Sequence, residues 1–131
     1  MPELTADDRL AIAEIMAAYC FAIDQGRWDT LPALFTEDCR LDFGEVMGVF
    51  EGHAGLERFA GMLRSTGLVM RHYSTNLLLH AVGGGARAES YVLALTGPSG
   101  SRRQSTGRYE DELVKVDGRW RIRVRRAIIE V

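Results

Sequence analysis

The sequence of 131 residues has a net charge of −2, a hydrophobic content of 47% and a charged content of 26%. This composition is typical of a folded, soluble domain, and it excludes an intrinsically disordered chain. No apolar run approaches the roughly 20 residues that span a membrane, and the first residues lack the basic and apolar regions of a signal peptide. We therefore expect a single domain over residues 1–131, located in the cytoplasm and without a membrane partner.

The two cysteines, Cys20 and Cys39, are too few for a disulfide framework and lack the spacing of metal ligands. We expect both thiols to be reduced and in or near the core, as is usual in the cytoplasm. Basic residues are concentrated between Arg102 and Arg126, but they alternate there with apolar residues and acids. This alternation is typical of a strand with one solvated face, so we expect no nucleic-acid partner.

A first helix is predicted by apolar residues at helical spacing over residues 12–23. Thr5 is placed to cap its start, although Asp8 stands where a capping box has Glu or Gln. Gly26 marks its end. Asp24 would lie in the last turn, where a carboxylate opposes the negative end of the helix dipole. This unfavourable placement indicates a function for Asp24.

The next part of the chain predicts shorter elements. A short second helix is expected over residues 28–35, a short strand over 39–43, a loop or hairpin over 44–48, and a third helix from His53 or Ala54 to about Ser65. Glycine and acidic residues separate these segments.

The second half of the chain predicts long strands. They cover residues 68–82, 86–96, 102–117 and 119–131, and Asp117-Gly118 forms the turn between the last two. Helices followed by long, hairpin-linked strands indicate an α+β fold. We expect a cone-shaped α+β barrel in which three N-terminal helices pack on a strongly curved, mostly antiparallel sheet. A cavity for a small molecule would lie between the helices and the sheet.

His72 is the most informative residue of the strand at 68–82. On strict alternation it shares one face with Met70, Ser74, Asn76 and Leu78. An imidazole on an apolar face beside a cavity is a candidate general base. His72 could also be a core histidine bonded to a backbone carbonyl, and Asp24 could simply cap the turn that follows the helix.

Several spaced motifs resemble the SnoaL-like family of the nuclear-transport-factor-two-like superfamily. They are Tyr19-x4-Asp24, Gly26-Arg27-Trp28-Asp29-x-Leu31, Leu34-Phe35-Thr36-Glu37-Asp38, Arg71-His72-x3-Asn76, Gly107-x-Tyr109-x-Asp111-x-Leu113 and the hairpin from Asp117 to Ile122. The resemblance covers nearly the whole chain and implies the cone-shaped fold. It does not specify a function, because the superfamily contains dehydratases, isomerases, cyclases, dehydrochlorinases and non-enzymes.

The motif around His72 is most similar to lindane dehydrochlorinase and, more distantly, to scytalone dehydratase. In those enzymes a histidine, oriented by an aspartate, removes a proton from carbon while a leaving group departs. The resemblance implies these roles for His72 and Asp24, and it places a catalytic arginine at Arg125. Strict alternation instead groups Arg126 with the inward residues of the last strand, and a β-bulge would reconcile the two assignments.

The sequence therefore favours a cofactor-independent lyase or isomerase that acts on a hydrophobic, cyclic small molecule. The expected catalytic residues are Asp24, His72 and Arg125, and the expected substrate-binding residues are Tyr19, Met70, Asn76, Tyr91, Leu93 and Tyr109. No metal or other cofactor is expected. The alternative is a binding or accessory protein that uses the same cone without chemistry. The long strands also predict a homodimer joined through the outer face of the sheet.

Overall fold

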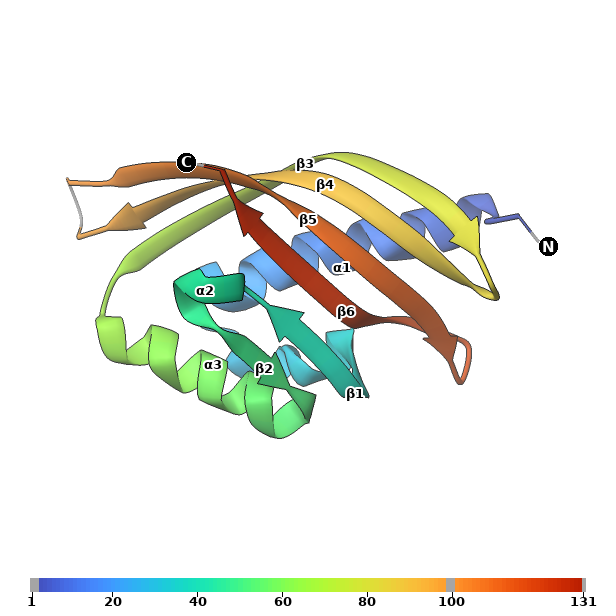
Figure 1. Ribbon diagram of the computed structural model, residues 1–131, viewed down its shortest axis with the longest axis horizontal. Coiled ribbons are helices and arrows are strands. Elements are labelled where there is room, and N and C mark those ends of the chain that lie inside the picture. Colours follow the sequence, from blue (N-terminus) through green and yellow to red (C-terminus); the bar gives the residue numbers. More distant parts are fainter. Residues whose placement is uncertain (1–2, 99–100, 131) are drawn as a thin grey trace.

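The computed structural model describes residues 3–98 and 101–130 and has helices packed on one curved sheet (Figure 1). The helices are α1 (Ala6–Asp24), α2 (Gly44–Met47) and α3 (Gly52–Thr66), with two 3-10 turns at Trp28–Thr30 and Pro32–Leu34. The strands are β1 (Phe35–Asp42), β2 (Val49–Glu51), β3 (Val69–Val82), β4 (Gly85–Gly97), β5 (Arg103–Val116) and β6 (Arg119–Ile129).

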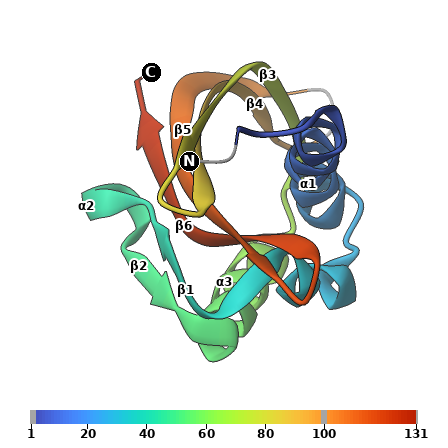
Figure 2. The same ribbon diagram turned by 90° about the vertical axis from the view of Figure 1, so that its right-hand side faces the viewer.

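The six strands form a single sheet in the order β2-β1-β6-β5-β4-β3. All neighbouring strands are antiparallel except β1 and β6, which run parallel. The sheet curves around α1, and α3 lies below it near β1 and β2 (Figure 2). The sheet does not close, because β3 and β2 are its two free edges. The expected α+β fold, with helices on a curved and mostly antiparallel sheet, is confirmed.

The segment after α1 differs from the sequence prediction. The expected helix over 28–35 is two separate 3-10 turns, and Pro32 begins the second of them. Strand β1 starts at Phe35 rather than at residue 39, because Phe35, Thr36, Cys39 and Leu41 are buried against the rest of the core. The expected loop over 44–48 contains the single helical turn α2.

Asp8 connects the start of α1 to the β5–β6 hairpin, close to its turn. The Thr5 hydroxyl accepts the Asp8 N–H, and the Asp8 carboxylate accepts the Thr5 N–H, so Asp8 completes a capping box. The same carboxylate accepts hydrogen bonds from Trp120 Nε1 at 2.9 Å and from Lys115 Nζ at 3.2 Å. Asp is therefore suited to this position, because its carboxylate bonds to the β5–β6 hairpin as well as to Thr5.

Two irregular positions change which side chains face α1. In β3 the pairing with β4 shifts between Thr75 and Leu78, where Asn76 has a φ of 58°. The prediction that Asn76 and Leu78 continue the face of His72 is therefore wrong. Leu77 packs against the core, and Leu78 is 54% exposed.

In β6 the pairing with β5 shifts at Arg123, because Leu113 pairs with Ile122 while Glu112 pairs with Val124. The extra residue is a β-bulge that changes the alternation of the strand. As a result, Ile122 and Arg125 are both buried, and Arg126 is exposed. The structure thus selects Arg125, rather than Arg126, as the inward arginine.

Candidate active site

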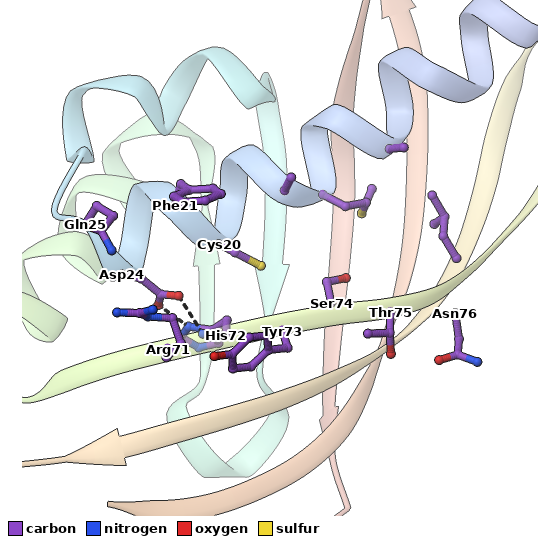
Figure 3. Close-up of a pocket in the computed structure, with 14 residues that line it drawn as sticks. Cys20, Phe21, Asp24, Gln25, Arg71, His72, Tyr73, Ser74, Thr75 and Asn76 are labelled. Atoms are coloured by element: carbon purple, nitrogen blue, oxygen red, sulfur yellow. Dashed lines mark hydrogen bonds and ion pairs between the residues drawn. The ribbon is translucent and has the colours of Figure 1, made fainter. Parts of the chain in front are cut away.

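The centre of the site is a carboxylate–imidazole pair formed by Asp24 at the end of α1 and His72 on β3 (Figure 3). Asp24 Oδ1 lies 2.6 Å from His72 Nδ1, and Asp24 Oδ2 accepts the backbone N–H of His72 at 2.6 Å. The side chains are 4% and 15% exposed, respectively. Both oxygens of one carboxylate therefore hold the same residue and fix the orientation of its ring.

These contacts account for an acid at the last turn of α1. The helix dipole disfavours a carboxylate there, and partial burial adds a desolvation cost. Two short hydrogen bonds from His72 offset both effects. Among the residues that the structure describes, His72 Nε2 has no hydrogen-bond partner.

A pocket of about 470 Å³ lies beside this pair, between α1 and the free edge strand β3. Its lining consists of Ala13, Met16, Ala17, Cys20, Phe21, Asp24 and Gln25 from α1, and of residues 71–77 from β3 (Figure 3). The volume is in the range of small-molecule sites. Apart from Asp24, Gln25 and the polar residues of β3, the lining is apolar, which suits a ligand with a hydrophobic body.

Arg125 does not line this pocket. It is fully buried on β6 and forms a two-point ion pair with Asp111 of β5, with Nε–Oδ1 at 2.8 Å and Nη2–Oδ2 at 2.9 Å. Its guanidinium carbon lies 3.8 Å from the ring centre of Tyr109 and 4.4 Å from that of Tyr19. Burial alone would lower the pKa of Arg125, but the Asp111 carboxylate raises it above its ordinary value.

The aromatic residues expected around the cavity lie in two different places, the core and the exposed face of the sheet. Tyr19 and Tyr109 are buried in the core, in edge-to-face contact, and burial raises the pKa of both hydroxyls above the ordinary value. Tyr91 is 57% exposed and pairs with Thr75, and Leu93 pairs with Tyr73. Since Val92 and Ala94 are the residues of β4 that share the inner face with His72, the assignment of Tyr91 and Leu93 to the pocket is wrong.

Met70 is partly buried against the core and is not part of the pocket lining, whereas Asn76 lines its far end. The sequence interpretation missed Met16, Cys20 and Ser74 as lining residues. Their spacing contained the signal: Cys20 and Met16 precede Asp24 by four and eight residues on the same helix, and Ser74 follows His72 by two on the same strand.

No set of three His, Cys, Asp or Glu side chains is grouped to bind a metal ion within residues 3–98 and 101–130. Over the same part of the chain, none of the helices combines the length and hydrophobicity needed to cross a membrane.

Comparison with known proteins identifies the family of this chain. Residues 4–126 match the SnoaL-like domain. The uncharacterised protein Rv2910c of Mycobacterium tuberculosis is 27% identical over 118 residues, which are 88% of this chain and 80% of that protein.

Solved structures agree with this assignment. Rv3472 of Mycobacterium tuberculosis, a protein of unknown function, is 28% identical with a TM-score of 0.84, covering 95% of this chain and 72% of that one. The hexachlorocyclohexane dehydrochlorinase LinA type 2 has a TM-score of 0.87 at 21% identity, covering 95% and 86% of the two chains, and shares the fold. The chain belongs to the SnoaL-like domain family.

Proposed function

We propose that the protein is a cofactor-independent lyase or isomerase in which His72 removes a proton from carbon. The observation that carries this proposal is the bond between Asp24 Oδ1 and His72 Nδ1 at the wall of a small-molecule pocket. With Nδ1 held by the carboxylate, Nε2 is the nitrogen that takes the proton. Asp24 then stabilises the imidazolium as it forms, as a carboxylate does in a catalytic triad.

The substrate class follows from the pocket and from the family. A cavity of about 470 Å³ with a largely apolar lining suits a compact, hydrophobic, cyclic molecule. A dehydrochlorinase of hexachlorocyclohexane shares the fold, which supports the elimination of a group from a ring as a candidate reaction. At 21% identity that likeness concerns the fold alone. The proposal therefore depends mainly on the Asp24–His72 pair.

The test is a screen of cyclic hydroxy-ketones and halogenated rings in deuterated water, read by loss of substrate and by uptake of deuterium at carbon. His72→Ala should lower the rate roughly 10²- to 10⁴-fold, the usual range for a general base. Asp24→Asn should also cause a large loss, because it removes the group that orients the ring and stabilises its charged form.

His80→Ala is the matched control, because His80 lies on the same strand and contacts Glu89 at 3.3 Å on the exposed surface. Its rate should equal that of the wild type. If His72→Ala instead turned over the substrate at the wild-type rate, catalysis by this pair would be refuted.

A binding or accessory protein is the second candidate, and one observation favours it. Arg125, the cation expected to stabilise a leaving group, is buried outside the pocket in an ion pair with Asp111. Tight binding of ring compounds that does not change on replacement of His72, and that is accompanied by no deuterium uptake, would support this candidate.

We also propose that two copies associate through the outer face of the sheet. Tyr91 and Tyr73 are exposed there on adjacent strands, beside Leu93. Adjacent exposed aromatic residues of this kind are typical of interfaces. Sedimentation at micromolar concentration should give a dimer, and Leu93→Glu should give a monomer with an unchanged circular dichroism spectrum. A wild-type monomer under these conditions would rule out this association.

A further inference from the structure

The hydrogen bonds of Arg125 are incomplete in a way that points to a ligand. A guanidinium group has five N–H donors. Two of them bond to Asp111, and one Nη2 hydrogen is directed at the Met16 sulfur, with Nη2 and Sδ 2.8 Å apart. Nη1 is buried and has no partner among the described residues. A thioether is a weak acceptor, so three of the five donors lack a strong hydrogen-bond acceptor, although the Tyr19 and Tyr109 rings also stabilise the buried cation.

Met16 separates this group from the pocket. It lies on α1, two turns before Asp24, and it both lines the pocket and contacts the guanidinium. Methionine has three rotatable bonds and adapts readily to its surroundings. A change of its rotamer would therefore join the pocket to Arg125 without movement of α1 or of the sheet.

We propose that Met16 is a displaceable cover over Arg125, and that the ligand carries a carbonyl-type oxygen which replaces the Met16 sulfur on the guanidinium. The inference rests on the proposed use of the pocket for a small molecule. It identifies the ligand as a cyclic ketone or a compound of the same polarity, with its oxygen toward β6 and its C–H bond toward His72.

A neutral oxygen fits this position better than an anion. Asp111 already balances the charge of Arg125 through two hydrogen bonds, and both side chains are fully buried. A carboxylate or phosphate would add an uncompensated negative charge to a site of low polarity. A carbonyl oxygen adds none, yet its two lone pairs can accept hydrogen bonds from two of the three remaining donors.

The arrangement also suits proton abstraction next to a carbonyl. When His72 Nε2 takes the proton, the electrons of the C–H bond form a C=C bond, and the π electrons of the carbonyl move to its oxygen. The result is an enolate and an imidazolium, with no change in the number of electrons. The charge that develops on oxygen would be stabilised by donors that are already in place.

The experiment compares cyclohexanone with methylenecyclohexane, which has nearly the same shape but a CH2 group in place of the oxygen. Dissociation constants are measured by NMR titration for the wild type, Met16→Ala and Met16→Leu, and carbonyl-13C cyclohexanone reports hydrogen bonding directly through its chemical shift. Circular dichroism establishes that each variant is folded. Met16→Leu is the matched control, because leucine fills a similar volume but is branched and less able to move aside.

The preference for the ketone over the hydrocarbon should increase from Met16→Leu to the wild type to Met16→Ala, with the extremes differing roughly tenfold, as expected for a hydrogen bond to a charged group. The bound carbonyl carbon should shift downfield in the wild type and in Met16→Ala. An equal preference in all three proteins, without a downfield shift, would overturn the proposal and leave Arg125 as a purely structural ion pair. The measurement is repeated with His72→Ala, which should keep the preference. A failure of the ketone site is thereby distinguished from a failure of His72 as the base.

Discussion

The ion pair of Arg125 with Asp111 provides a quantitative test of how the interior of this fold is stabilised. Both side chains are 0% exposed, and two hydrogen bonds of 2.8 and 2.9 Å join them. Replacing one partner leaves the other charge buried without compensation. Such a change typically costs about 3–5 kcal/mol in the free energy of unfolding. We expect this loss for Arg125→Met and for Asp111→Asn.

For a domain of this size, the expected loss corresponds to a decrease in Tm of roughly 12–20 °C. The double variant Arg125→Met with Asp111→Leu removes both charges and fills the space with apolar atoms. Its stability should lie within about 1 kcal/mol of the wild type, since buried ion pairs are often replaceable by hydrophobic residues. The effect of the double change would then be far smaller than the sum of the two single effects.

Urea unfolding followed by circular dichroism measures all of these variants. The control is Arg126→Met, because Arg126 neighbours Arg125 but forms an exposed pair with Glu110 at 3.6 Å. Loss of an exposed pair costs about 0–1 kcal/mol. If Arg125→Met and Asp111→Asn were as mild as this control, the guanidinium would be hydrated in solution rather than dry and incompletely bonded.

Two further predictions concern positions outside this ion pair. Asn76 has a φ of 58°, so Asn76→Gly should leave the free energy of unfolding unchanged. Asn76→Val should lower it by about 1–2 kcal/mol in urea unfolding, because a β-branched residue disfavours this conformation. Equal stabilities of the two variants would contradict the β-bulge. The Thr5 N–H and then the Trp120 indole hold the pKa of Asp8 well below its ordinary value. The stability that Asp8 provides should therefore be present above its unfolded pKa, near pH 4, and be lost on acidification below it. Asp8→Asn should weaken this acid dependence in thermal unfolding, and an unchanged pH profile would refute it.

The elements with a strong period could be predicted from the sequence. The helical spacing over residues 12–23 gave α1, and the alternation after residue 68 gave the four long strands within a few residues of their bounds. The turn between the last two strands followed from its chemistry: Asp117 and Gly118 both have positive φ, at 51° and 78°, as the tightest hairpins require.

The secondary structure from Trp28 to Phe35 was harder to predict, because the spacing of its apolar residues is ambiguous. Two 3-10 turns bury Leu31 and leave Trp28 half-buried, and over so few residues this spacing resembles one helix. The start of β1 was hidden by the polar run Thr36-Glu37-Asp38, in which Thr36 is nevertheless buried by its tertiary surroundings.

The β-bulges explain why the candidate site could be predicted only in part. Asp24 and His72 were predictable because the first lies at a helix end and the second precedes the irregular position in β3. Beyond Asn76 the alternation reverses, so counting by twos from His72 assigns the wrong face. Tyr91 and Leu93 were misplaced for a related reason: only the register of β4 on β3, which pairs Ala94 with His72, shows which of its faces is inside.

The bulge at Arg123 has the largest consequence, because it turns Arg125 toward α1. A regular β6 would place Arg125 on the outer face with Arg123, and no cation would lie behind the pocket. The inward guanidinium of Arg125 is held by the Asp111 carboxylate and by the rings of Tyr19 and Tyr109. An acid and a β-bulge that together hold a cation behind a pocket bring no clear gain in stability, since apolar residues could fill the same space at little or no cost. Their presence is the reason to look for a role of Arg125 in ligand binding rather than in folding.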